Sequence, residues 1–259
     1  MPKSARRAAT NRRPARAPAR KRSGAAVTAV LEDLAVANRV LAHYGVLDGF
    51  GHVSARHPED SGRFLISRSL APELVTTADI MVFDLDCNAA GGDARQPYVE
   101  RFIHGEIYKA RPEVTAVVHS HAPPVIPFAA SSVGLRPIYH MGSFLGRGAP
   151  VFDIRERFGN TDMLVRNRAQ GEALAETLAR SEVVLMRGHG FVAVAQSLPL
   201  AVYRAIYTQL NAMLQQQAIA LGGAVKYLDP EEAALSDATN SGVVARPWEL
   251  WRRKARGGR

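Results

Sequence analysis

The sequence has little that would suit a secreted or membrane-embedded protein. It contains a single cysteine, Cys87, which excludes an intramolecular disulfide and a cysteine-rich zinc site and fits a reducing compartment. No run of about 18 apolar residues occurs, so we expect neither a membrane-spanning helix nor a membrane partner. No apolar signal segment follows the arginine-rich beginning of the chain, and we therefore expect a cytoplasmic protein. The similarity of this beginning to an organellar transit peptide is an alternative that the sequence leaves open.

Acidic side chains are absent from residues 1–23, which carry nine of the 33 basic residues. The rest of the chain therefore has 24 basic and 24 acidic residues and is formally neutral. This segment also lacks the large apolar side chains that would offset the entropy lost on ordering. We therefore predict a disordered basic tail over residues 1–24 and a single domain over residues 25–259. A basic tail can contact nucleic acid, but the neutral remainder argues against nucleic-acid binding as the function.

Helical and strand patterns alternate along the predicted domain. The strands begin as a hairpin around the turn 58–62 and then alternate with helices, which indicates a mixed or largely antiparallel sheet with helices on both faces. No Gly-x-Gly-x-x-Gly follows the first strand and no Gly-Lys-Ser loop occurs, which argues against a nucleotide-binding fold. After residue 221 we expect a polar tail that carries Trp248 and Trp251. The predicted helices cover residues 27–45, 97–110, 161–180 and 199–221, and the predicted strands cover residues 51–57, 63–67, 79–86, 116–118, 137–140, 151–154, 183–186 and 191–195.

Two histidines stand at the end of a buried apolar strand, in the order His119-Ser120-His121. On an extended chain, residues i and i+2 point to the same side, so both imidazoles can reach one metal ion. A third histidine, His189, lies between two glycines after another apolar strand, where the backbone can approach closely. Each histidine alone is better explained as a hydrogen-bonded core or loop residue. Three of them at strand ends favour a metal site.

Glu100 is the acid that such a site needs for proton chemistry. It stands at the beginning of a predicted helix, where the positive end of the helix dipole stabilises a carboxylate. It could complete the metal shell or act as a general acid or base, although the spacing alone favours a simple first-turn glutamate. Of the other histidines, His52 and His140 lie at strand ends near the predicted site. We expect the remaining ones, His43, His57 and His104, to face solvent.

Together these motifs resemble the class II aldolase and adducin family over nearly the whole chain after the tail. Gly51-His52-Val53-Ser54 is similar to the family's Gly-Asn-Val-Ser loop, Glu100 takes the place of its catalytic acid, and His119, His121 and Gly188-His189-Gly190 take the places of its metal ligands. The resemblance implies a three-layer α/β/α fold with a central, mostly antiparallel sheet. It also implies a homotetramer with sites between subunits. Retention of all four site residues argues against a non-enzymatic adducin-like module.

The sequence departs from the sugar-phosphate members of this family where these bind the phosphate. The family's serine pair before the acid reads Tyr98-Val99 here, the asparagine of its first loop reads His52, and its threonine-glycine turn reads Ser67-Arg68-Ser69. The loss of small hydroxyl donors suits a flatter, less charged substrate. Arg68 can still bind a carboxylate through two hydrogen bonds. We therefore expect His52, Ser67, Arg68 and Ser69 to bind a small carboxylate substrate.

This version of the site resembles the branch of the family that holds decarboxylases of hydroxylated aromatic and heteroaromatic acids, such as dihydroxyphthalate decarboxylase. The resemblance implies a lyase with one divalent ion on the three histidines, zinc or manganese, although iron or cobalt would also fit. The ion would stabilise an enolate or phenolate oxygen while the carbon–carbon bond breaks. Glu100, or a water that it orients, would supply the proton, and Tyr139 or His140 would assist.

Three alternatives stay open at this point. An aldolase or dehydratase for a small hydroxy-ketone or sugar derivative would use the same metal. An iron-dependent oxygenase could also use a histidine-rich site. A non-catalytic adducin-like interaction module would need neither metal nor turnover. Release of carbon dioxide, release of an aldehyde and consumption of oxygen distinguish the catalytic alternatives.

Overall fold

The structure, a computed structural model, describes residues 20–257. Residues 1–19 of the predicted disordered tail lie outside the described residues. Residues 20–24, which the sequence assigned to the tail, instead form the beginning of helix α1 (Arg20–His43), because arginine and lysine are good helix formers and extend it. Gly45 follows the end of this helix with a positive φ of 65°, a conformation that glycine adopts without strain.

Seven strands form one central sheet. They are β1 (His52–Arg56), β2 (Arg63–Ser67), β3 (Ile80–Asp84), β4 (Ala116–Ser120), β5 (Val151–Phe152), β6 (Val183–Met186) and β7 (Gly190–Ala195). Their order is β3-β2-β1-β4-β7-β6-β5, and all neighbours are antiparallel except β5 and β6, which are parallel. The prediction of a mostly antiparallel sheet is confirmed. The central strand is β4, in which His119 pairs with His52 of β1 and with Val192 of β7.

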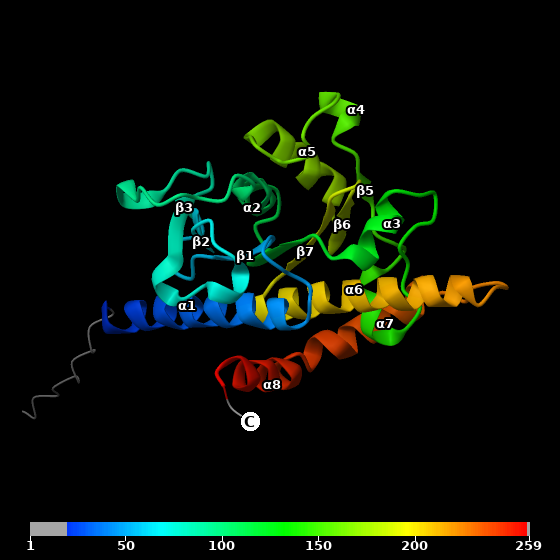
Figure 1. The fold of residues 1–259 in the computed structure, drawn as a ribbon. Coiled ribbons are helices and arrows are strands. Elements are labelled where there is room, and N and C mark those ends of the chain that lie inside the picture. Colours follow the sequence, from blue (N-terminus) through cyan, green and yellow to red (C-terminus); the bar gives the residue numbers. More distant parts are fainter. Residues whose placement is uncertain (1–19, 258–259) are drawn as a thin grey trace, which may run out of the picture.

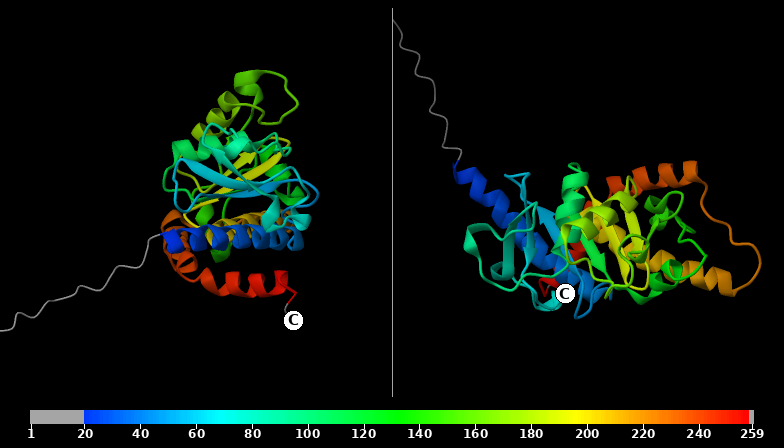
Figure 2. Two further views of the ribbon diagram at one scale, coloured as in Figure 1. Left: turned by 90° about the vertical axis from the view of Figure 1, so that its left-hand side faces the viewer. Right: turned by 90° about the horizontal axis from the view of Figure 1, so that it is seen from above.

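Helices cover both faces of this sheet, as the three-layer prediction requires (Figure 1). Besides α1 they are α2 (Arg101–Ala110), α3 (Ile126–Ala129), α4 (Arg155–Phe158), α5 (Arg168–Leu178), α6 (Leu198–Ala220), α7 (Pro230–Gly242) and α8 (Ala245–Ala255). α2 and α5 pack against each other on one face. α1 and α6 lie side by side on the other face, and α8 packs outside them (Figure 2). No helix within residues 20–257 has both the length and the apolarity to cross a membrane.

The alternation of side chains along the strands decides which residues reach which layer. In β4, Ala116 and Val118 belong to the core beneath α1 and α6, whereas Val117 belongs to the core beneath α2 and α5. Both faces of the strand are buried, which explains the continuous apolar sequence Ala116-Val117-Val118. The same alternation directs His119 to the side of α2, where the site is built.

The predicted strand at residues 137–140 is wrong. This segment is irregular and leads into a 3-10 helix, η5 (His140–Leu145). A side chain of α6, rather than a neighbouring strand, takes up part of the backbone hydrogen bonding here: Ile138 N–H donates to Asn211 Oδ1 (3.0 Å), and Asn211 Nδ2 donates to the Arg136 carbonyl (2.8 Å). The other 3-10 helices are η1 (Pro72–Leu74), η2 (Thr77–Asp79), η3 (Ala90–Gly92) and η4 (Pro123–Val125).

The predicted polar tail after residue 221 is also wrong, because α7 and α8 occupy it. Trp248 and Trp251 stand three residues apart on one side of α8 and are 6% and 4% exposed. Trp251 Nε1 donates to Tyr44 Oη at 2.9 Å, which docks α8 onto the end of α1. The two tryptophans therefore extend the hydrophobic core instead of standing in solvent.

Two predicted helices begin later than expected. The first begins at Arg101 rather than residue 97, with Glu100 at its N-cap position. The second, α5, begins at Arg168 rather than residue 161, after the side chain of Asn167 accepts the N–H of Gln170. Residues before Asn167 use their backbone groups to hold site side chains, as described next, and this use prevents a helix there.

Candidate metal centre

Four side chains from separate parts of the chain gather at one end of the sheet. His119 lies near the end of β4, His121 follows that strand, His189 lies in the turn between β6 and β7, and Glu100 immediately precedes α2. One ligand atom from each of the four residues lies within 4.8 Å of the others. The fold thus brings together the residues that the sequence selected as metal ligands and proton-transfer group.

The distances within this cluster suit a common metal ion. Nε2 of His121 is 3.0 Å from Nε2 of His119 and 3.0 Å from Nε2 of His189. Two nitrogen ligands about 2.1 Å from a common ion would lie about 3.0–3.4 Å apart, the range between a right angle and a tetrahedral angle. Oε2 of Glu100 lies 3.5 Å from Nε2 of His119 and 3.6 Å from Nε2 of His189. The three imidazoles therefore face one point, with the carboxylate beside it.

The opposite ring nitrogens show which protonation state these histidines adopt. Nδ1 of His119 lies 3.2 Å from the carbonyl oxygen of Phe191, and Nδ1 of His189 lies 3.0 Å from that of Met163. A carbonyl only accepts, so each Nδ1 carries a proton and donates it. In the neutral rings of His119 and His189, Nε2 then carries a lone pair. Nε2 of His121 lies 3.0 Å from both and can donate a proton to only one of them, so at least one contact sets two lone pairs against each other unless a cation lies between them. The residues therefore fit a divalent metal ion.

Glu100 favours positive charge at the centre of the cluster. Burial raises the pKa of its carboxyl, but the facing imidazoles of His119 and His189 outweigh burial and hold that pKa well below its usual range. Burial lowers the pKa of His189, but the hydrogen bond and charge of Glu100 outweigh it and raise that pKa. Burial lowers the pKa of His121 to about 4. A proton on His189 and a metal ion would therefore compete for the same place.

Two glycines allow the strands and turns to come this close. A Cβ atom at Gly190 would collide with the backbone of Ser120, and one at Gly51 would lie 2.9 Å from the carbonyl oxygen of His119. Gly51 also has a φ of 82°, which residues with a side chain rarely adopt. The close approach of β7 to β4 brings the turn that carries His189 within reach of His121.

A cleft of about 560 Å³ opens beside the cluster, and Glu100, His121 and His52 form part of its lining. The rest of the lining is largely apolar, and Phe50 is 70% exposed, with its ring centroid 6.4 Å from that of His121. A largely apolar cleft with a few polar groups suits a small organic ligand that these polar groups orient. The apolar lining residues include Phe50, Leu70, Tyr98, Val99 and Leu164.

The predicted substrate-binding residues lie at different depths around this cleft. His52 and Ser69 line it. Ser67 is buried, and its Oγ donates to Tyr98 Oη at 3.3 Å. Arg68 is not among the lining residues, and its Nε donates to Asp79 Oδ1 at 2.8 Å. The substrate-binding roles of these residues stay predictions.

Tyr139 lies apart from the cluster within one chain. Its ring packs against that of Tyr207 on α6, with 6.4 Å between centroids, and it is not among the lining residues of the cleft. His140, next to it, is exposed. A role for Tyr139 at the site therefore requires that another copy of the chain supplies it.

The expectation that His104 faces solvent is wrong. This residue is fully buried on the inner face of α2 and lies in a chain of hydrogen bonds between His52 and Tyr108. Burial lowers the pKa of His104 to about 3 and holds that of His52 well below its usual range. A signal was present in the sequence, because Glu100, His104 and Tyr108 recur every four residues and so share one helix face.

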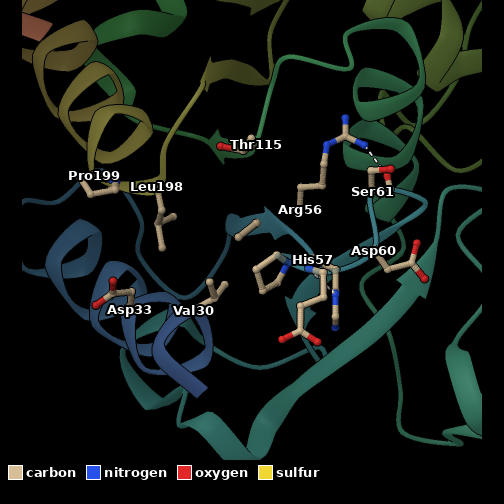
Figure 3. Close-up of a pocket in the computed structure, with 12 residues that line it drawn as sticks. Val30, Asp33, Arg56, His57, Asp60, Ser61, Thr115, Leu198 and Pro199 are labelled. Carbon is tan, nitrogen blue, oxygen red and sulfur yellow. Dashed lines mark hydrogen bonds between the residues drawn. The ribbon is translucent and has the colours of Figure 1, made fainter. Parts of the chain in front are cut away.

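A larger cavity, of about 650 Å³, lies between α1, the β1–β2 hairpin and the beginning of α6 (Figure 3). Its one guanidinium, from Arg56, donates to the carbonyl oxygens of Ser61 and Tyr108, both at 2.7 Å. The Arg56 guanidinium therefore stabilises the local backbone and is already occupied by hydrogen bonds within the chain. None of the residues of the metal cluster lines this cavity, and we place the functional site at the cluster instead.

Comparison with known families agrees with this geometry. Residues 32–216 match the class II aldolase and adducin N-terminal domain. The match covers well over half of the chain, and the chain belongs to this family. The family assignment and the fold that the sequence implied are both confirmed.

Relatives that share more sequence carry decarboxylase names. The chain is 40% identical over 242 residues to "Decarboxylase tropJ" of Talaromyces stipitatus, a match that covers 85% of this chain and 91% of that protein. It is 35% identical over 235 residues to the 3,4-dihydroxyphthalate decarboxylase of Arthrobacter keyseri, covering 84% of this chain and 90% of the relative. The expected decarboxylase branch of the family is therefore the one that these relatives represent.

Solved structures show the same fold at lower identity. An aldolase II superfamily protein from Pseudomonas syringae matches with a TM-score of 0.75 at 23% identity, covering 91% of this chain and 95% of that one. The L-fuculose 1-phosphate aldolase of Glaciozyma antarctica matches with a TM-score of 0.75 at 22% identity, covering 95% of each chain. Their similarity establishes the fold of the chain.

Proposed function

We propose that this protein is a metal-dependent lyase that decarboxylates a hydroxylated aromatic or heteroaromatic carboxylic acid. The observation that carries the proposal is the cluster of His119, His121 and His189 beside Glu100, with all four ligand atoms within 4.8 Å. The decarboxylase relatives at 35% and 40% identity support the same reaction class. A divalent cation bound there would polarise a substrate oxygen and stabilise the negative charge left when the carbon–carbon bond breaks.

Glu100 is the group that moves the proton in this proposal. The N–H of Val165 donates to its Oε1 at 3.0 Å, so Oε2 is the oxygen on the side of the imidazoles. A carboxylate in that place accepts a proton from the substrate's hydroxyl group or orients a water. It then returns the proton to the carbon that carbon dioxide has left.

The cleft supports an aromatic substrate. Tyr98 and Val99 stand where sugar-phosphate enzymes of this family carry small hydroxyl side chains, and both line the cleft. We assign His52 and Ser69, in the lining, to the carboxylates of the substrate. Arg68 would join them by leaving Asp79, and Ser67 would act through Tyr98, whose hydroxyl it contacts.

The finer properties follow from the family resemblance and from the donor set. Three imidazoles and a carboxylate suit zinc or manganese, and iron and cobalt accept the same ligands. We propose a homotetramer in the cytoplasm, in which Tyr139 of one chain reaches the cleft of a neighbour. Light scattering that gives a monomer would overturn this placement of Tyr139.

Metal analysis of the purified protein, followed by a screen of ortho-hydroxy aromatic acids for carbon dioxide release, tests the function. We expect one divalent ion per chain and carbon dioxide release from at least one acid of this class. Aldehyde release from a hydroxy-ketone would replace the proposal with an aldolase. A protein that binds no metal and turns over none of these compounds would be an adducin-like interaction module.

A further inference from the structure

A chain of four buried side chains runs from the cleft into the core between α2 and the sheet. His52 Nδ1 lies 2.7 Å from His104 Nε2, His104 Nδ1 lies 2.6 Å from Ser54 Oγ, and Ser54 Oγ lies 2.8 Å from Tyr108 Oη. All four residues are at most 3% exposed. Neither the metal cluster nor the proton transfer assigned to Glu100 uses His104, Ser54 or Tyr108.

If both imidazoles are neutral, each side chain inside this chain donates one hydrogen bond and accepts one. The three hydrogen bonds must then all run in the same direction, which leaves two possible arrangements. In the outward arrangement Tyr108 donates to Ser54, Ser54 to His104, and His104 to Nδ1 of His52. In the inward arrangement each donor and acceptor is exchanged, and Tyr108 receives the hydrogen bond from Ser54. The two arrangements place the ring proton of His52 on different nitrogens.

Tyr108 decides between them. Its hydroxyl must donate its proton to an acceptor, and among the described residues Ser54 Oγ is its hydrogen-bond partner. The guanidinium of Arg56 lies over the ring, with Cζ 4.7 Å from the centroid, and offers no acceptor. In the inward arrangement the buried hydroxyl proton would have no acceptor, which costs about 1–3 kcal/mol. The outward arrangement satisfies every donor in the chain.

The two imidazoles in this chain are neutral. His104 is completely buried, and its partners His52 and Ser54 carry no negative charge, so a proton added to it would be an uncompensated buried charge. One proton therefore lies between the two rings, on Nε2 of His104. The remaining proton of His52 is on Nε2, whereas the hydrogen bond of this ring within the described residues is made by Nδ1, and His52 lines the cleft.

We infer that His104 is a positioning residue that holds His52 in the tautomer with its proton on Nε2, so that His52 is a fixed hydrogen-bond donor to an anionic oxygen of the substrate. The inference deepens the proposed function and rests on it for the nature of the substrate. A fixed donor recognises a carboxylate or phenolate oxygen and cannot take up a proton from the substrate. Proton transfer is thereby left to Glu100.

The tautomer of His52 can be measured without substrate. Ring nitrogen shifts of the zinc-loaded, ¹⁵N-histidine-labelled protein distinguish protonated from unprotonated nitrogens, and the His52→Asn variant assigns the signals by their loss. We expect Nδ1 of His52 to be unprotonated and Nε2 protonated. A protonated Nδ1 overturns the inference whatever the activity assay gives. The expected spectrum in a protein that releases no carbon dioxide overturns the proposed function alone.

Two variants of His104 test the consequence for the substrate. His104→Met fills the space without polar groups, so His52 loses its partner, and we expect KM to rise about 10- to 100-fold with bound metal unchanged. His104→Gln still offers an N–H to His52 and a carbonyl to Ser54, and we expect it to restore KM to within about threefold of the unmodified protein. An unchanged KM in the Met variant, or no rescue by Gln, would refute the positioning role.

Discussion

At the scale of single residues, the backbone holds two of the three imidazoles of the cluster. The carbonyl oxygens of Phe191 and Met163 fix the rings of His119 and His189 from behind. These two rings are therefore oriented before any ion binds, which lowers the entropy lost on binding. Glu100 is held in the same way by the N–H of Val165.

Replacement of Glu100 by Gln separates proton transfer from metal binding. The amide keeps the size of the side chain but cannot take up a proton, so we expect kcat to fall about 10²- to 10⁴-fold while the three imidazoles retain the ion. Steady-state kinetics and metal analysis of the same preparation measure both effects. Glu172→Gln, on an exposed position of α5, is the matched control and should leave kcat unchanged. Unchanged turnover in Glu100→Gln would remove this residue from the mechanism.

The gathering of His119, His121, His189 and Glu100 could be predicted from the sequence because these residues lie at strand ends and a helix beginning, positions that apolar periodicity locates. The position of His104 could be inferred only in part, from the four-residue spacing that it shares with Glu100 and Tyr108. Its burial depends on which face of α2 packs on the sheet, and Tyr98 and Phe50 reach the cleft through irregular chain that has no periodicity. The tertiary arrangement alone decides their environment.

At the scale of elements, the loop before α5 shows why a helix prediction failed. Residues 163 and 165 give a carbonyl and an N–H to His189 and Glu100, groups that a helix would have consumed internally. The irregular segment at residues 137–140 is a similar case, since Asn211 replaces a neighbouring strand. In both places, side chains distant in sequence take over backbone hydrogen bonds.

The docking of α8 makes a testable contribution to stability. Trp251 is 4% exposed and lies edge-on to Tyr44, with 5.8 Å between ring centroids. We expect Trp251→Ala to lower the free energy of unfolding by about 3–5 kcal/mol, measured by urea denaturation. Leu250→Ala, at a neighbouring position that is 51% exposed, should change it by less than about 0.5 kcal/mol. Equal effects of the two substitutions would mean that α8 is not firmly docked.

At the scale of the whole molecule, the site depends on β1, β4, β7, α2 and two loops together. Such a site does not exist in the unfolded chain, so an ion that binds it stabilises the fold. The order of the strands could not be read from the sequence, because it depends on pairings between segments far apart. The family resemblance supplied the three-layer arrangement that the structure confirms.

Removal of the ion should therefore destabilise the entire protein. At a free zinc concentration 100-fold above Kd, we expect binding to add about 2.7 kcal/mol to the free energy of unfolding. Thermal denaturation with and without a chelator measures this difference. His121→Ala, which lacks the ligand nearest to both other imidazoles, should melt at the same temperature in either condition. An equal response of this variant to the chelator would locate the ion elsewhere.

The contact between Gly190 and the backbone of Ser120 changes how relatives of this chain should be recognised. A homologous sequence can keep every histidine and the glutamate and still carry a larger residue at position 190. Its side chain would collide with the backbone of Ser120 and force β7 away from β4. Such a chain would match the ligand motif while being unable to gather its imidazoles. Glycine at position 190 is therefore as informative as the three histidines when one judges whether a related sequence can form this cluster.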